Sequence, residues 1–513
     1  MLFQEIAEAS RAVTATRARS TKIELLAACL SRMTPDEAAI GVGFLSGELR
    51  QGKIGLGYAA VRSLETPDAA AEPSLTLHDV DAVLDRIAAI RGARSASLRM
   101  QALAELFARA TALEQPFLER LLVWELRQGA LEGILLDAIA KAARVSATNV
   151  RRAVMLAGDA KRVAAVALAQ GEAGLAEFRV EVLRPIGPML AQTAATLTEA
   201  FDGRTELSLE HKLDGARIQV HKDGSDVRVF TRSLNDVTER VPEIVESTLA
   251  LPAKSLILDG EAIAVGSGGR PAPFQTTMRR FGRKLDVHAL RDTLPLHPFY
   301  FDLLYLDGGE LLEHPEGERF AALERLTAPS QRVERLVARS PEEAELFLDR
   351  ALELGHEGVM AKDVASPYEA GRRGASWMKL KKAHTLDLVV LAAEWGSGRR
   401  KGFLSNLHLG ARDPTNNAFV MLGKTFKGLT DELLRWQTEK LKSLELSRSD
   451  WVVYVKPELV VEIAFDGVQT SSQYPGGVAL RFARVKRYRD DKPASEADTI
   501  DTVRAIHARS IAP

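Results

Sequence analysis

Apolar and polar positions follow three different patterns along the chain. Up to about residue 175, Ala, Leu, Glu and Arg dominate, and apolar residues recur with the helical period. Between about residues 196 and 384, strand-like and helix-like patterns mix. From about residue 385 onward, short apolar segments are separated by Gly-rich turns. The order of these patterns predicts an all-α part, an α+β part and a strand-rich part.

Local signals refine this order. Residues 35–37 and 76–79 are typical helix starts, and a further helix is expected at about 341–354. Two prolines and a glycine within 184–191 break any helix, which indicates a linker between the first and second parts. We therefore expect three domains, which are a helical domain at 1–176, a middle domain at 177–384 and a C-terminal domain at 385–513.

The last part contains short apolar segments and one helical segment. The apolar segments predict strands at 386–393, 407–412, 419–423, 452–455 and 460–465. The helical segment lies near 429–443. A five-stranded barrel with one helix is the pattern of an OB-fold, a common platform for nucleic acids.

The segment 210–217 organises the rest of the interpretation. Alternating apolar residues around it predict strand, turn, strand, and an Asp-Gly pair at 223–224 predicts the hairpin turn that follows. Lys212 is thus expected where a strand ends and the backbone turns. Gly215 would let a ligand approach the backbone.

Lys212 is a candidate covalent nucleophile. An amine attacks only when it is neutral, and a free lysine has a pKa of about 10.4. The site must therefore remove water from Lys212 or place other cations beside it, such as Arg217 or a metal ion. The alternative is a surface hairpin with ordinary charges, and the rest of the chain decides between the two.

Length and cysteine content limit the class of protein. A chain of 513 residues is too long for one core and suits three domains. The single cysteine, Cys29, excludes internal disulfides and a four-cysteine zinc site, and its apolar surroundings predict a core residue. No apolar run is long enough to span a membrane and no N-terminal targeting signal is visible, so we expect a cytoplasmic location.

The net charge of −1 is unexpected for a protein that binds nucleic acid, because a basic surplus usually provides phosphate affinity. Basic residues are nevertheless clustered at 279–284, 379–382, 399–401 and 484–489. A solvated face explains any one cluster more simply. Four clusters near other motifs favour phosphate contacts.

A five-residue segment, Glu-Leu-Arg-Gln-Gly, occurs at 48–52 and again at 125–129. Each copy is expected to follow a helix and to end in a glycine turn. The glycines could simply end the helices. Their backbone N–H groups could also bind phosphates. Both copies are similar to turns in the helical DNA-binding domain of ATP-dependent DNA ligases, and this resemblance implies a grip on duplex DNA that does not read sequence.

The Lys-x-Asp-Gly-x-Arg motif from Lys212 to Arg217 resembles the nucleotidyl-lysine motif of DNA ligases, RNA ligases and mRNA capping enzymes. The chain is most similar to ATP-dependent DNA ligases of the bacterial and archaeal type, from about residue 20 to about residue 493. The resemblance implies a helical DNA-binding domain at 1–176, a nucleotidyltransferase (adenylation) domain at 177–384 and an OB-fold at 385–513.

The resemblance also implies roles for the first motifs. Lys212 would accept AMP from ATP, and Glu210 and Arg217 would contact the nucleotide. Arg232 would contact the nucleotide and the nick. Glu261, in an Asp-Gly-Glu segment, would hold a ribose hydroxyl or Mg²⁺.

Further roles are implied for residues in the motifs between Phe301 and Lys379. By resemblance, Phe301 would stack on adenine, with Phe299 as the alternative. Glu357 would bind the metal. Lys379 and Arg373 would bind ATP, with Arg372 as the alternative to Arg373.

The last two contacts lie toward the C-terminus. Lys381 shares one strand face with Lys379 by period-two alternation, which favours an anion between them. Arg484 belongs to a basic segment, 481–492, that resembles the motif binding the β and γ phosphates of ATP.

The reaction implied is nick sealing in duplex DNA with ATP and Mg²⁺, through a covalent lysyl-AMP intermediate, in repair, replication or recombination. The enzyme would be a monomer with a hinge near 383–387. An NAD-dependent ligase would carry a four-cysteine zinc finger, which one cysteine excludes. An RNA ligase or a GTP-using capping enzyme would lack the helical domain. A non-catalytic DNA-binding protein on a ligase scaffold is opposed by the intact Lys212, Glu261 and Glu357.

Overall fold

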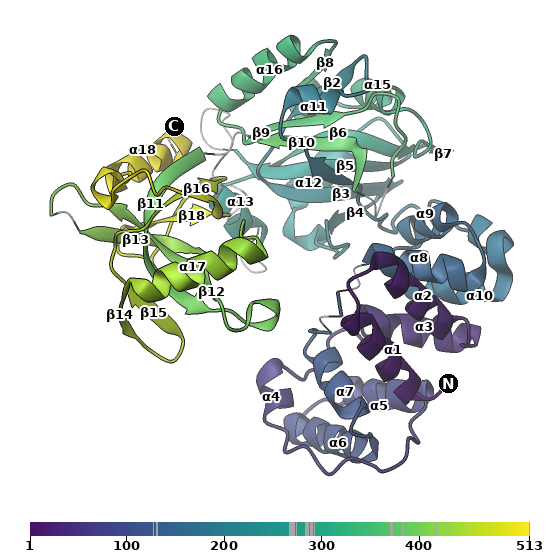
Figure 1. The fold of residues 1–513 in the computed structure, drawn as a ribbon. Coiled ribbons are helices and arrows are strands. Elements are labelled where there is room, and N and C mark those ends of the chain that lie inside the picture. Colours follow the sequence, from purple (N-terminus) through teal and green to yellow (C-terminus); the bar gives the residue numbers. More distant parts are fainter. Residues whose placement is uncertain are drawn as a thin grey trace.

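The computed structural model describes residues 1–126, 128–129, 132–265, 272, 274–282, 287, 291, 293–369, 373–381, 384–416 and 418–511. The chain folds as an all-α part, an α+β part and a strand-rich part, so the predicted fold class is confirmed. Figure 1 shows the C-terminal domain beside the middle domain and the helical domain below it. None of the described helices is long and apolar enough to cross a membrane.

The helical domain is built from amphipathic helices whose apolar faces share one core. Its helices are α1 (Phe3–Ala15), α2 (Arg19–Leu30), α3 (Pro35–Ser46), α4 (Tyr58–Arg62), α5 (Leu77–Ala89), α6 (Ser95–Arg109), α7 (Glu114–Leu122), α8 (Glu132–Ala143), α9 (Ala147–Ala157) and α10 (Ala160–Ala176). The predicted starts of α3 and α5 are confirmed, because Thr34 and Thr76 cap them. Cys29 is buried in this core, as expected.

Both copies of the repeated segment follow a helix, α3 or α7. In the first copy, Arg50 and Gln51 bind Asp81 of α5. In the second, Gln128 accepts a hydrogen bond from Ser10 at 2.8 Å, and Arg127 lies outside the described residues. The glutamines therefore hold each turn within the domain.

The middle domain contains two sheets, one with the strand order β1-β10-β9-β2-β8 and the other with the order β4-β3-β5-β6-β7. The strands are β1 (Leu190–Thr193), β2 (Leu207–His211), β3 (Ala216–Asp223), β4 (Asp226–Thr231), β5 (Ser255–Ala264), β6 (Leu296–Leu306), β7 (Gly309–Glu310), β8 (Arg335–Ala338), β9 (Gly358–Lys362) and β10 (Arg373–Lys381). The helices are α11 (Leu197–Phe201), α12 (Pro242–Leu249), α13 (Phe274–Phe281), α15 (Glu316–Leu326) and α16 (Pro341–Glu353).

The segment 210–217 does not join two paired strands. β2 lies in the first sheet, and β3 pairs with β4 and β5 in the second. The backbone N–H of Lys212 still donates to the carbonyl of Gly358 at 2.9 Å before the chain crosses between the sheets. The alternative interpretation of this motif as a surface hairpin is therefore wrong, because Lys212 lies where the chain crosses between two sheets.

The C-terminal domain has its own core and a sheet with the order β13-β12-β11-β15-β14, in which β16 pairs with β11 and β19. Its elements are β11 (His384–Trp395), β12 (Leu404–Arg412), β13 (Phe419–Thr425), α17 (Asp431–Ser443), β14 (Glu445–Arg448), β15 (Val452–Val455), β16 (Val460–Phe465), β17 (Gly467–Thr470), β18 (Val478–Arg481), β19 (Arg484–Tyr488) and α18 (Ile500–Ile511). The five predicted strands and α17 are present. The expectation of a single helix is wrong, because Ile500 and Val503 bury α18 against the core.

One basic cluster has a different role from the one suggested by its sequence. Arg280 of α13 is buried, and its guanidinium binds the carboxylate of Glu243 at 2.7 Å and the carbonyl of Arg240 at 3.0 Å. Arg280 and Glu243 therefore form a structural ion pair in the core. Arg283 and Lys284 lie outside the described residues.

Candidate active site

A cavity of about 1480 Å³ lies at the crossing between the two sheets of the middle domain. Ten of the eleven predicted site residues line it: Glu210, Lys212, Arg217, Arg232, Glu261, Phe301, Glu357, Lys379, Lys381 and Arg484. The side chain of the eleventh, Arg373, and all of its alternative, Arg372, lie outside the described residues.

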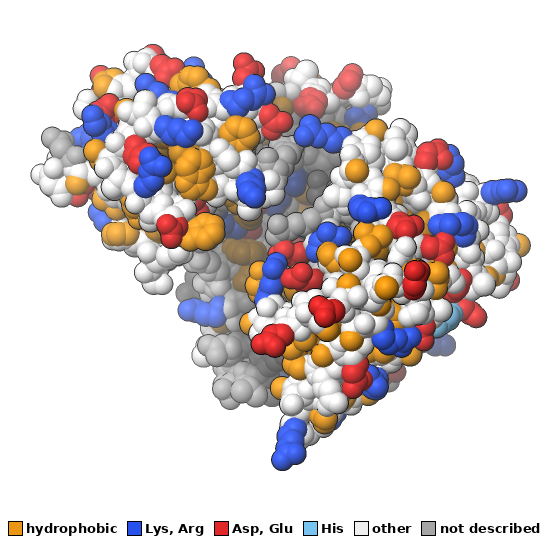
Figure 2. Space-filling view, turned by 60° about the horizontal axis from the view of Figure 1, so that its bottom comes forward, with side chains coloured by type: hydrophobic (Ala, Val, Ile, Leu, Met, Phe, Trp, Pro, Cys, Tyr) orange, Lys and Arg blue, Asp and Glu red, His pale blue; other side chains and the backbone are white. Residues whose placement is uncertain are grey.

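Three domains contribute to this cavity. Lys53 comes from the helical domain, while Lys427, Asp466, Arg481 and Arg484 come from the C-terminal domain. Among the described lining residues, eleven are Lys or Arg and six are Asp or Glu. This local surplus of positive charge suits phosphate groups. Figure 2, by contrast, shows blue and red side chains mixed over the visible outer face, in line with the net charge of −1.

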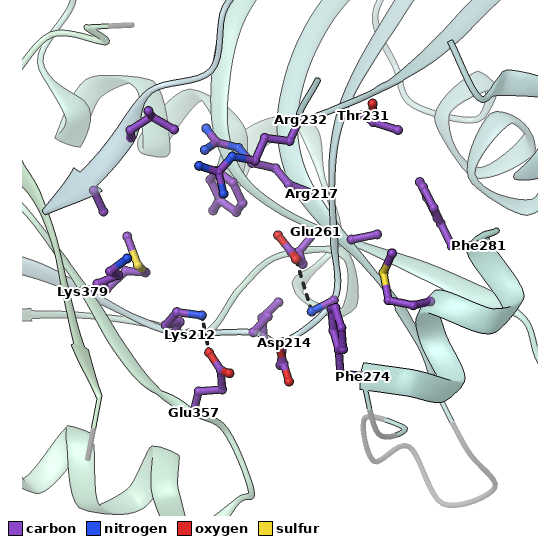
Figure 3. Close-up of a pocket in the computed structure, with 18 of the residues that line it drawn as sticks. Lys212, Asp214, Arg217, Thr231, Arg232, Glu261, Phe274, Phe281, Glu357 and Lys379 are labelled. Atoms are coloured by element: carbon purple, nitrogen blue, oxygen red, sulfur yellow. Dashed lines mark hydrogen bonds and ion pairs between the residues drawn. The ribbon is translucent and has the colours of Figure 1, made fainter. Parts of the chain in front are cut away.

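Lys212 is held by an acidic partner at one side of the cavity. Its ammonium group forms an ion pair with Glu357, which Figure 3 shows. The same carboxylate oxygen binds Lys381 at 2.7 Å. Burial would raise the pKa of Glu357, but the charges and hydrogen bonds of Lys212 and Lys381 outweigh it and lower that pKa. Glu357 therefore stays ionised between two ammonium groups.

Glu357 is placed by the turn that precedes β9. The next residue, Gly358, has φ of +146° and packs against the backbone of β10 at Leu380. A side chain at this position would overlap that backbone, so only glycine fits. The turn thereby aims Glu357 at the nucleophile candidate.

Glu261 lies within β5 and not in a hairpin turn. Its carboxylate accepts the backbone N–H of Gly215 at 3.2 Å, as drawn in Figure 3. Burial raises the pKa of Glu261 to about 7, against the lowering effects of Lys212 and Arg217. A Cβ at Gly215 would come within 2.5 Å of the carbonyl of Ala262, so glycine is needed here for strand packing. The expected reason, approach of a ligand to the backbone, is not the constraint that the structure shows.

Arg217 is fixed deep in the cavity wall. Its guanidinium binds both oxygens of Asp259, at 3.0 and 2.6 Å, and the carbonyl of Met189 at 2.6 Å. It also lies over the rings of Phe301 and Trp377. Burial alone would lower the pKa of Arg217, but Asp259 raises it, so this side chain is a permanent cation.

An aromatic and ionic pocket lies beside Arg217. Phe301 and Trp377 meet edge to face, with ring centroids 5.9 Å apart. Lys362 lies 4.4 Å from the centre of the Trp377 ring and binds the carboxylate of Glu210 at 2.7 Å. Burial raises the pKa of Glu210 to about 7, although Lys362 opposes this. Phe301 lines the cavity, and Phe299 is not among its lining residues.

Arg232 differs from Arg217 because it is exposed at the cavity. No hydrogen bond or ion pair holds its guanidinium within the described part of the chain. Figure 3 shows it close to Arg217 and across the cavity from Lys379. Lys379 and Lys381 of β10 both line the cavity, which confirms their predicted shared face.

The lysines and arginines of the basic segment 481–492 have different partners, and Lys486 and Arg487 bind Glu462. Arg481 and Arg484 face the cavity, and Arg481 binds Asp214 at 2.7 Å. Arg489 and Lys492 instead bind Asp387 of β11, at 2.8 and 2.9 Å. Of the lysines and arginines in this segment, only Arg481 and Arg484 line the cavity and can meet a ligand there.

Sequence reasoning did not assign several lining residues. They include Lys53, Phe274, Met278, Phe281, Lys362, Trp377, Lys427, Asp466 and Phe482, whereas Arg481 belongs to the basic segment that was expected to bind phosphates. Strand alternation could have found Trp377, which lies two residues before Lys379. Lys53 carries no such signal, because it reaches the cavity from another domain.

Comparisons with known proteins agree with this geometry. Residues 188–381 match the family model described as "ATP dependent DNA ligase domain". Residues 51–140 match "DNA ligase N terminus", and residues 400–492 match "ATP dependent DNA ligase C terminal region". The three matches cover all three domains.

Full-length relatives carry the same name. A "Probable DNA ligase" of Anaeromyxobacter sp. (strain Fw109-5) is 59% identical over 514 residues, covering 100% of this chain and 99% of the relative. Another, of Mycolicibacterium gilvum (strain PYR-GCK), is 57% identical over 515 residues and covers 99% and 100%. The solved structure named "Pmar-Lig_PreS3" has a TM-score of 0.63 at 19% identity, over 95% of this chain and 100% of that one, and shows the shared fold. The chain belongs to the family of ATP-dependent DNA ligases.

Proposed function

We propose that this ligase works through a covalent lysyl-AMP intermediate on Lys212. The neutral amine attacks the α-phosphorus of ATP, an N–P bond forms, and the bond from the α-phosphorus to the bridging oxygen breaks so that pyrophosphate leaves. The ammonium group first loses one proton to solvent, and the attacking amine loses a second proton to solvent as the phosphoramidate forms. The observation that carries this proposal is the position of Lys212 at the sheet crossing, in a cavity with a cationic surplus.

The adenine base is proposed to bind beside Phe301 and Trp377. Both rings line the cavity, and base–aromatic stacking is worth about 1–3 kcal/mol per base. The indole N–H of Trp377 is buried without a hydrogen-bond partner among the described residues. The Glu210–Lys362 pair adds a buried acceptor and donor at the same wall.

The phosphates are proposed to extend toward Lys379, Lys381, Arg481 and Arg484. These side chains come from β10, β18 and β19 and face one cavity from two domains. Phosphoryl transfer depends mainly on positioning and on stabilising negative charge, so cations on both sides suit the first step.

Glu261 and Glu357 fit a Mg²⁺ ion held jointly with phosphates. The described residues contain no cluster of three or more His, Cys, Asp or Glu that could hold a metal unaided. Mg²⁺ usually takes one or two carboxylates and completes its shell with phosphate oxygens and water. The carboxylate of Glu261, which the backbone N–H of Gly215 contacts, suits such a shared site. Bound Mg²⁺ would neutralise charge developing on the phosphates.

The later steps are proposed to occur on a nick in duplex DNA. AMP passes from Lys212 to the 5′-phosphate, and the 3′-hydroxyl then attacks that phosphate and displaces AMP. Arg232 and Lys53 are exposed cations at the cavity and suit backbone phosphates. The C-terminal domain must move away first, because Arg481 closes over Asp214.

The proposal is tested by following label through the steps. Enzyme labelled from ATP is freed of nucleotide and mixed with nicked duplex DNA or with a nicked duplex whose broken strand is RNA. Transfer to the DNA nick and sealing support the proposal, and transfer only to RNA would identify an RNA ligase. Action in repair, replication or recombination, a monomeric state and a cytoplasmic location stay predictions.

A further inference from the structure

The linker that follows the helical domain is attached to the strand that carries Arg217. Three alternate residues of β3, which are Arg217, Gln219 and His221, bind the linker backbone at every third position. Arg217 donates to the carbonyl of Met189 at 2.6 Å. The amide of Gln219 accepts from the N–H of Ile186 at 2.7 Å and donates to its carbonyl at 3.0 Å. His221 accepts from the N–H of Leu183 at 3.1 Å. This set of contacts is the linker clamp.

In the linker clamp, side chains of β3 take the place of the backbone hydrogen bonds that a neighbouring strand would supply. β3 is already paired with β4 and β5, so the linker lies against side chains and not against a free strand edge. Pro185 and Pro188 have no N–H to offer. Buried backbone groups need partners, and Gln219 and His221 supply them while being 5% and 0% exposed. Leu183 has φ of +70°, which the contacts around it must hold in place.

The protonation of His221 fits this role. Its Nδ1 accepts a hydrogen bond from Leu183, so the proton lies on Nε2, which is 2.8 Å from the side-chain oxygen of Gln219. Burial lowers the pKa of His221 to about 3, so the ring is neutral and can accept. The ring therefore orients Gln219 toward Ile186.

The other side of the linker is fastened to the helical domain. The N–H of Gly187 donates to the carbonyl of Met155 in α9 at 2.8 Å. Arg152 of α9 donates to the carbonyl of Phe178 at 3.2 Å and to Glu313 of the middle domain at 3.3 Å. One apolar cluster runs from the helical domain through Ile186 and Met189 into the middle domain, whereas the C-terminal domain has a separate core.

We propose that Gln219 and His221 are positioning residues that hold the helical domain in a fixed relation to the nucleophile strand, so that a duplex gripped by that domain meets the cavity at its nick. They touch neither the cavity nor ATP, since neither lines the cavity. Their effect is therefore confined to the steps that use DNA. The inference rests on the proposed function, in which Lys53 of the helical domain meets backbone phosphates of a nicked duplex.

The test uses the full-length enzyme with Gln219→Met and His221→Phe, which keep side-chain bulk and lose the hydrogen bonds to the linker. Thr248→Val is the matched control, because it removes a buried hydrogen bond to Tyr300 in the same domain but far from the linker in sequence. The measurements are the KM and kcat for sealing a nick that is already adenylated, and the single-turnover rate of self-adenylation from ATP. Protease cleavage within residues 177–189 reports release of the linker.

Both variants should raise the KM for the nick by about tenfold, because a loosely tethered domain loses preorganisation. kcat at saturating nick and self-adenylation should stay within about twofold of wild type, and the linker should become cleavable. Thr248→Val should leave the KM unchanged. If Gln219→Met fails to fold, His221→Phe carries the test, because it leaves both hydrogen bonds between Gln219 and Ile186 available and removes only the bond to Leu183 and the bond that orients Gln219.

An unchanged KM in folded variants would overturn the inference. Equal losses of self-adenylation and sealing would also overturn it, because the residues would then serve the nucleotide site or the core. Failure of the proposed function gives a different result. Wild-type enzyme would then form no covalent label from ATP, whereas the KM of each variant for the adenylated nick could still be compared with that of the wild type.

Discussion

Arg481 of the C-terminal domain binds Asp214 of the nucleophile turn, with 2.7 Å between its Nη1 and the carboxylate Oδ2. The two residues are 267 positions apart. A second bridge runs from Lys381 to Asp466 at 3.3 Å. The C-terminal domain is thereby closed over the cavity that contains Lys212, an arrangement that suits the proposed first step.

Removal of the Arg481 guanidinium should affect the first step most. Arg481→Ala is expected to slow self-adenylation by about a hundredfold, because one preorganised charge on the leaving phosphates is lost. Sealing of an already adenylated nick should change little. Single-turnover labelling with ATP measures the first effect. Arg487→Ala is the matched control, since that arginine lies on β19, is exposed, pairs with Glu462 and does not line the cavity. An equal loss in both variants would contradict a specific role.

The two phenylalanines of β6 offer a second comparison. Phe301 lines the cavity and Phe299 does not. Phe301→Ala should raise the KM for ATP by about tenfold to a hundredfold, since a stacked base is worth about 1–3 kcal/mol. Phe299→Ala should change it much less. Steady-state kinetics with varied ATP decides between them, and the reverse order would place adenine elsewhere.

The raised pKa of Glu261 should make the stability of the folded chain depend on pH. Burial raises its pKa from 4.5 to about 7, so the folded chain binds this proton at higher pH than the unfolded chain does. The folded state therefore loses stability as pH rises from about 4.5 to about 7 and is unaffected by this group above that range. Glu261→Gln should remove this loss, which is about 1–3 kcal/mol. Denaturant unfolding without Mg²⁺ at pH 5 and pH 7.5 measures this change in the free energy of unfolding. An equal change in wild type and Glu261→Gln would rule out the raised pKa of Glu261.

The sequence predicted the site better than the path of the chain through it. Period-two alternation correctly placed Lys379 and Lys381 on one face, and short motifs at strand ends led to Lys212, Glu261 and Glu357. Alternation does not tell which sheet a strand joins. The pattern strand, turn, strand around Lys212 therefore did not reveal that tertiary packing puts β2 and β3 in different sheets.

Long-range contacts explain the other differences. Lys53 reaches the cavity from the helical domain, and local sequence cannot report that. Arg280 is part of a basic run, yet Glu243 from another helix neutralises it in the core. Arg481 and Arg484 share a motif, and only the domain closure reveals that Arg481 meets the nucleophile turn.

The most direct test of the account is covalent labelling with α-labelled ATP and Mg²⁺, followed by denaturation, for wild type and Lys212→Arg. The arginine keeps the charge beside Glu357 and cannot act as the amine nucleophile. Label that survives denaturation in the wild type and is absent from the variant is the predicted result. Equal labelling of both proteins, or no label in the wild type, would contradict a lysyl-AMP intermediate on Lys212.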